Sequence, residues 1–140
     1  MKIRPCAEFR ADFPDDQIWD DDNNVVQFGG RNIAEALGTI LQGQGYEVLS
    51  LEEHPEHGWD FVVGLNAGEL LFEISFGGET WHLSTSGQSI DRWPKPSDYA
   101  ELLIALDAEM RKDGRFSDIG WRRENWQGKN IAPTPHPVDA

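Results

Sequence analysis

Basic side chains are scarce in this chain of 140 residues, where 12 Lys and Arg stand against 25 Asp and Glu and the formal net charge is −13. A field of this sign opposes binding to nucleic-acid phosphates and to anionic membrane surfaces. Cysteine occurs only at Cys6, so no internal disulfide forms, and no apolar run reaches the roughly 18 residues of a membrane-spanning helix. The first 13 residues carry charges where a secretory signal would be apolar. We therefore expect a cytoplasmic protein that binds neither nucleic acid nor membrane.

Motifs that bind metals or cofactors are also missing. Residues 54–60 hold two His, one Glu and one Asp, but not at the helical spacing of His-Glu-x-x-His enzymes. Asp20, Asp22 and Asn24 begin like a calcium loop, yet the glycine and the glutamate that complete this motif are absent. We expect no metal, no cofactor and no enzymatic activity.

The chain does contain enough apolar material for a folded domain. Hydrophobic residues make up 39% of it and aromatic residues 11%, whereas disordered acidic chains are poor in aromatic residues. A chain of this length can bury roughly two-thirds of its unfolded surface. We find no repeat and no linker, so residues 1–140 are predicted to form a single domain. Residues 132–140, which contain three prolines, are predicted to be an extended, mobile tail.

Two segments have helical periodicity. Over residues 31–44, apolar side chains recur at i, i+4, i+7 and i+8, which gives a helix one apolar stripe. Gly29 and Gly30 precede it, where a helix N-terminus can hold an anion, although the acidic residues nearby repel phosphate. Residues 97–112 form the second predicted helix, with Ser97 as its expected cap and acidic residues in its first turn.

Alternation of apolar and polar side chains marks strands in the middle of the chain. These strands are predicted over residues 46–51, 59–65, 70–76 and 81–85. Gly77-Gly78 suits a two-residue hairpin turn, because both central positions of such a turn need positive φ. This turn would pair Phe76 with Glu79 and fix the register of the two strands that it joins.

The elements together predict an α+β fold in the order helix, four antiparallel strands, helix. Each helix has one apolar stripe and the sheet has one apolar face. A two-layer sandwich, in which both helices pack on one face of a four-stranded antiparallel meander, buries all three surfaces. The other face of the sheet is left to water or to a partner. Residues 1–28 show no such pattern, apart from a candidate edge strand near residues 9–13.

Polar side chains on this outer face form one candidate site. The derived register places Glu73 directly opposite His82, with Cβ atoms about 5 Å apart, and Asp60 in the neighbouring row. A carboxylate beside an imidazole can orient it for proton transfer, but no activated nucleophile shares the row. A cross-strand charge pair on a solvated face, worth at most about 1 kcal/mol, is the simpler interpretation.

The densest acidic run lies in residues 1–60, which hold 13 of the 25 carboxylates but only four basic side chains. In this run five aspartates surround a tryptophan. Tryptophan is enriched at interface hot spots, and surrounding carboxylates steer a basic partner toward it. We predict six partner-binding residues: Asp15, Asp16, Trp19, Asp20, Asp21 and Asp22. The alternative is that the tryptophan ring closes the end of a small core.

In size, charge and element order, the chain resembles the small acidic α+β immunity proteins that bacteria pair with toxin domains. The resemblance implies an inhibitor that binds a basic toxin or enzyme and occludes its active site. Two alternatives stay open. One is a small ligand-binding protein or enzyme that uses the outer sheet face around Glu73 and His82. The other is a nucleic-acid mimic that acts as a regulatory adaptor.

Overall fold

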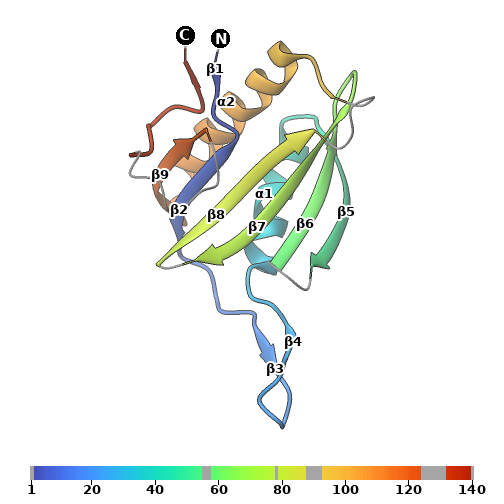
Figure 1. The fold of residues 1–140 in the computed structure, drawn as a ribbon, viewed down its shortest axis with the longest axis vertical. Helices are drawn as coiled ribbons and strands as arrows, with labels where there is room; N and C mark the ends of the chain where they lie inside the picture. Colours follow the sequence, from blue (N-terminus) through green and yellow to red (C-terminus); the bar gives the residue numbers. More distant parts are fainter. Residues whose placement is uncertain (1, 55–57, 78, 88–92, 124–131, 140) are drawn as a thin grey trace.

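One large sheet, two helices and two short strand pairs make up this fold. The computed structural model describes residues 2–54, 58–77, 79–87, 93–123 and 132–139. Along these residues the elements are β1 (Lys2–Ile3), β2 (Cys6–Ala11), β3 (Ile18–Trp19), β4 (Val25–Gln27), α1 (Arg31–Gly43), β5 (Glu47–His54), β6 (Gly58–Gly64), β7 (Glu69–Gly77), β8 (Thr80–Gly87), α2 (Pro96–Lys112), β9 (Phe116–Arg122) and β10 (Val138–Asp139) (Figure 1).

The large sheet has the strand order β5-β6-β7-β8-β2-β9, and neighbouring strands are antiparallel. Both helices lie behind the sheet in Figure 1. The predicted α+β class is confirmed. The predicted sheet of four strands is not, because β2 and β9 extend the meander beyond β8. A register shift in the β2–β9 pair and the positive φ of Asp118 interrupt the alternation in β9, which hid this strand from a search for period two.

The core forms where the helical stripes meet the inner face of the sheet. From α1 it receives Ile33, Leu37 and Leu41, all buried as their spacing predicts. On the sheet, the rings of Phe61 and Phe72 stack with centroids 4.9 Å apart. Burying one such side chain contributes about 1.5–3 kcal/mol, so the folding free energy resides in this layer. The cap predicted at Ser97 is wrong, because α2 begins at Pro96 and has Lys95 as its N-cap.

The strand registers preserve the predicted faces but differ by two residues. Gly77 pairs with Thr80 and Phe76 with Trp81, in place of the expected pairing of Phe76 with Glu79. For the β6–β7 hairpin, a match of the core faces predicts Leu65 opposite Leu70. The structure places Val63 there instead, which is a shift of the same amount. A slip of two residues returns every side chain to its original face, so the two faces are kept while the cross-strand partners change.

The two ends of the chain lie together, at one end of the molecule (Figure 1). β1 pairs with β10, and the Arg4 guanidinium donates two hydrogen bonds to the Asp139 carboxylate, at 2.6 and 2.7 Å. Thr134 also pairs with Trp121 of β9. The described part of the predicted tail is therefore hydrogen-bonded to the body, and its mobility stays a prediction.

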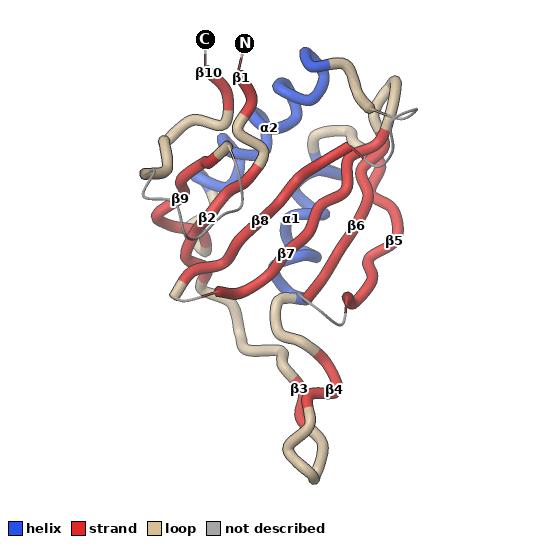
Figure 2. The backbone as a smooth tube through the Cα atoms, in the orientation of Figure 1, coloured by secondary structure: helices blue, strands red, loops and turns tan. Residues whose placement is uncertain are grey.

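At the opposite end, β3 and β4 form a hairpin that projects away from the sheet (Figure 2). It contains the acidic run. Across the described residues, neither helix is long and apolar enough to span a membrane.

Candidate functional site: an acidic hairpin and the hollow at its base

The tip of the hairpin is a turn closed by one of its own aspartates. One carboxylate oxygen of Asp20 accepts hydrogen bonds from the backbone N–H groups of Asp22 and Asn24, both at 2.9 Å. Asn23 takes the left-handed conformation that such a turn needs, with φ of 62°. The backbone hydrogen bond from Asn24 is the main reason that the pKa of Asp20 lies below its usual value. Asp20 therefore orders the turn on which its neighbours are displayed.

Apolar side chains on the two strands of the hairpin face solvent. Trp19 is 57% exposed, Val26 53% and Ile18 48%. Asp21 and Asp22 are exposed beside them. Within the described residues, no lysine or arginine forms an ion pair with these two carboxylates. The tip thus combines an exposed tryptophan with carboxylates that no cation of the described residues neutralises.

At the base of the hairpin, Asp16 closes the N-terminus of α1. Its carboxylate accepts hydrogen bonds from the backbone N–H groups of Gly30, at 2.8 Å, and Asn32, at 2.6 Å. These are among the N–H groups that a helix leaves unpaired, and the helix dipole favours a negative charge there. The sequence suggested an anion beside Gly29-Gly30, and the anion in the structure is a carboxylate of the chain itself.

Further hydrogen bonds fix the hairpin to the body. The side-chain amide of Gln27 donates to the Asp16 carbonyl at 2.7 Å, which joins the two stems. The Phe28 N–H donates to a carboxylate oxygen of Glu53 at 2.7 Å, and the Trp59 indole N–H donates to the Phe28 carbonyl at 2.9 Å. A two-stranded hairpin is marginal by itself, so these anchors set its direction relative to the sheet.

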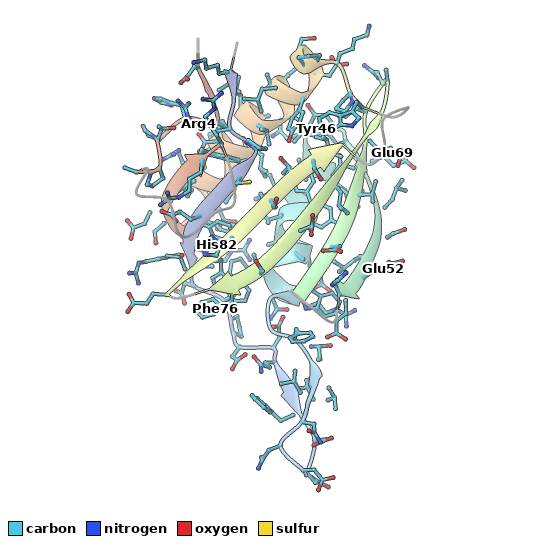
Figure 3. All side chains as sticks on the ribbon, viewed as in Figure 1. Arg4, Tyr46, Glu52, Glu69, Phe76 and His82 are labelled. Atoms are coloured by element: carbon cyan, nitrogen blue, oxygen red, sulfur yellow. The ribbon has the colours of Figure 1, made fainter. Side chains whose placement is uncertain are left out.

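A hollow of about 740 Å³ opens between the hairpin base and the nearest end of the sheet. Its lining includes four aromatic rings and two carboxylates: Phe13, Phe28, Phe76, Trp81, Asp15 and Asp16. The Phe76 ring lies near the end of β7 that is closest to the hairpin (Figure 3) and is 58% exposed. Its centroid is 5.0 Å from that of Trp81, in an edge-on arrangement.

Gly30 permits this arrangement at the start of α1. Its φ is 104°, and a Cβ atom there would lie 2.7 Å from the Trp81 ring. Only glycine meets both conditions without strain. The alternation of apolar and polar residues predicts Phe76 and Trp81 on the core face of the sheet, and it gives no indication of the hollow. The one signal that could have indicated it is the glycine pair, which lets an aromatic ring approach the helix.

The outer face of the sheet carries a row of side chains that crosses all six strands: Glu52, Asp60, Glu73, Ser84, Cys6 and Arg122. Three carboxylates therefore occupy adjacent positions on β5, β6 and β7. The sequence placed Asp60 and Glu73 on this face, but not side by side. At the other end of the row, Nη2 of Arg122 lies 3.3 Å from Oε1 of Glu8. The β5–β7 part of this row is thus made of acidic side chains only.

The predicted pairing of Glu73 with His82 is wrong. Because the register differs by two residues, Glu73 lies opposite Asp60 and Ser84, and His82 lies opposite Ser75 and Glu8. The His82 side chain is buried, and its Nε2 lies 3.2 Å from the Gly77 carbonyl oxygen. Figure 3 shows His82 on β8, well away from Glu52 on β5. Glu73 and His82 therefore do not face each other across the β7–β8 pair.

No three His, Cys, Asp or Glu side chains gather to hold a metal ion in the part of the chain that the structure describes. The His-rich turn of residues 54–60 falls partly outside that part, because residues 55–57 are not described.

Comparison of the chain with protein-family models and with curated proteins finds no match.

Proposed function

We propose that this protein is a binding module that captures a basic protein partner, as an inhibitor or immunity protein does, and that it is not an enzyme. The observation that carries the proposal is the anchored, projecting hairpin with an exposed tryptophan and carboxylates that no cation of the described chain neutralises. Proteins rarely keep several large apolar side chains together in solvent unless a partner covers them.

Two physical effects then contribute to binding, one before contact and one after it. Asp21 and Asp22 act at a distance, since complementary charge raises the rate of encounter up to about 10⁸–10⁹ M⁻¹s⁻¹ at low salt. Trp19 acts on contact, because a tryptophan buried at the centre of an interface is the residue type that most often dominates affinity.

The fixed hairpin also suits an inhibitor. A projecting element that does not need to be ordered on binding loses little conformational entropy, so more of its contact energy appears as affinity. Inserted into the cleft of a basic enzyme, it would exclude substrate. We further propose that this binding takes place in the cytoplasm, on the grounds of charge and cysteine content given above.

The test begins with the partner. The intact protein is used to isolate binders from its native source, and the purified binder is then mixed with Trp19→Ala, with the double variant Asp21→Asn/Asp22→Asn, and with a control. The control is Glu47→Gln/Glu101→Gln, which removes the same charge from β5 and α2, toward the other end of the body (Figure 1).

We expect Trp19→Ala to weaken binding about 30-fold or more, mainly through faster dissociation. The double aspartate variant should slow association about three- to tenfold at low salt and flatten its salt dependence, with the control nearer to the parent protein. A purified binder that is acidic, or one whose kinetics are the same for the parent and both hairpin variants, would overturn the proposal.

A further inference from the structure

The hollow at the hairpin base combines two kinds of lining that seldom occur together by chance. Four aromatic rings line its walls, and its rim carries Asp15, which is exposed. With about 740 Å³ it lies within the range of 300–1,000 Å³ that is typical of ligand sites. We propose that this hollow receives one arginine side chain of the basic partner. The inference rests on the proposed function and names the chemistry of one contact within it.

The lining favours a cation over a neutral apolar group. The faces of aromatic rings carry partial negative charge and attract cations within about 6 Å. Phe76 and Trp81 supply such rings at the sheet end of the hollow, and Phe28 supplies one at the hairpin stem. Asp15 provides a full negative charge at the mouth. Its carboxylate accepts one hydrogen bond, from the Gln17 N–H at 3.0 Å, which leaves further acceptor positions on its oxygens.

Asp16 attracts a cation into the hollow less strongly than its formal charge suggests. It accepts two backbone hydrogen bonds at the α1 N-terminus, and the positive end of the helix dipole partly offsets its charge. Its importance is geometric, because it holds the hairpin stem beside α1. Together with the fit of Trp81 against Gly30, this keeps the walls of the hollow in place before a ligand arrives. A preformed site needs little reorganisation on binding.

Arginine fits this lining better than lysine. The guanidinium group is planar, is weakly hydrated and stacks on aromatic faces, while its edge donates two parallel hydrogen bonds to one carboxylate. The ammonium group of lysine is compact and strongly hydrated, so it loses more on entering a hollow that is only partly open to water.

The molecule already uses this interaction beside the hollow. The guanidinium of Arg115 lies 4.6 Å from the centroid of the Phe13 ring, and Asp113 holds it with hydrogen bonds of 3.0 and 2.7 Å. That contact has the same three parts as the proposed one: an aromatic face, a guanidinium and a carboxylate. Arg115 itself is not among the residues that line the hollow.

The experiment titrates the intact protein with arginine blocked at both ends as N-acetyl-arginine methylamide. The readout is the NMR signal of the Trp81 indole N–H, assigned with Trp81→Phe. Blocked citrulline serves as the neutral analogue of the same shape, and blocked lysine as the second cation. The titration is repeated with Phe76→Ala, with Asp15→Asn, and with Glu101→Gln, which removes the same charge from α2, outside the lining of the hollow.

We expect a saturable shift of the Trp81 signal with arginine, at least tenfold weaker binding of citrulline, and weaker binding of lysine. Phe76→Ala and Asp15→Asn should each weaken arginine binding about two- to fivefold, and Glu101→Gln should leave it within experimental error. The Trp59 indole signal, which depends on the anchor to Phe28, reports whether each variant retains its fold. Phe76 is exposed and Asp15 lies at the rim, so neither change removes buried structure.

Equal binding of citrulline and arginine would overturn the proposal, and so would lysine binding as tightly as arginine. An unshifted Trp81 signal would do the same. If that signal stays unshifted while partner capture depends on Trp19, the hollow is not an arginine site and the proposed function stands. If arginine shifts the Trp81 signal while the partner binds every hairpin variant with the kinetics of the parent protein, the proposed function fails and the hollow remains a cation site.

Discussion

The body of this protein and its hairpin use the same residue types for opposite purposes. In the body, aromatic rings such as Phe61, Phe72 and Trp121 are almost completely buried. In the hairpin, Trp19 is more than half exposed and packs on no core. The carboxylates differ in the same way, since Asp107 in the body receives a hydrogen bond from the Trp121 indole at 2.8 Å, whereas the tip aspartates face water. The residues of the body are explained by folding, and those of the hairpin tip are not.

The strongest way to test this contrast is to remove one aromatic ring from each region. Phe72→Ala leaves a cavity beside Phe61 and should lower the free energy of unfolding by about 3–5 kcal/mol. Trp19→Ala should change it by less than about 0.5 kcal/mol, because the ring is exposed. Urea denaturation of both variants checks the pair. A large loss of stability in Trp19→Ala would mean that the hairpin tip supports the fold.

A second test uses pH to distinguish a buried titratable group from the exposed ones. The Tyr99 hydroxyl lies 2.6 Å from the Thr85 hydroxyl in the core, and burial raises the pKa of Tyr99 to about 12. A group whose pKa is higher in the folded state stabilises that state fully below its unfolded pKa, near 10. This stability is lost as pH rises from about 10 to 12. The loss should be about 2–3 kcal/mol.

Tyr99→Phe provides the control, because it cannot ionise. At neutral pH its unfolding free energy should be lower than that of the parent, because phenylalanine cannot make the hydrogen bonds of the Tyr99 hydroxyl. Between pH 10 and 12 its unfolding free energy should fall less steeply than that of the parent. Identical slopes in the two proteins would show that Tyr99 is not the group that titrates. Tyr46, whose pKa burial also raises, contributes equally to both curves.

The smallest contrast lies within the hairpin itself. Asp16→Ala removes the acceptor from two backbone N–H groups of α1 and should cost about 0.5–2 kcal/mol, as the loss of a helix cap does. Asp21 has no such hydrogen-bond partner among the described residues, so Asp21→Ala should change the free energy of unfolding by no more than about 0.5 kcal/mol. Thermal unfolding followed by circular dichroism compares the two. Equal effects would contradict the distinction between base and tip.

The sequence predicted those elements whose patterns are local and regular. The helix at residues 31–44 and the strands at 59–65, 70–76 and 81–85 follow directly from periods of 3.6 and 2. The register between paired strands was harder to predict from the sequence. A two-residue slip keeps every face, so the burial pattern cannot detect it, and the pairing of Glu73 with His82 failed for that reason.

The site depended on contacts between distant parts of the chain. Asp16 binds the start of α1 across a loop, and the hollow joins the hairpin stem, the α1 N-terminus and the ends of β7 and β8. No periodicity reports such contacts. The hairpin did leave a local signal, since Ile18-Trp19 and Val25-Val26 flank a run of Asp and Asn. Apolar pairs separated by turn-forming residues are typical of a hairpin, although strands this short are hard to recognise.

The pairing of β1 with β10 has a practical consequence for every measurement above. Both ends of the chain come together at the pole of the molecule farthest from the hairpin (Figure 1). A fluorophore, an affinity tag or a sensor surface attached at either end therefore leaves the acidic tip pointing into solution. Immobilising the protein through one terminus and then through the other should give the same binding kinetics, which makes the attachment point a built-in check on the assay.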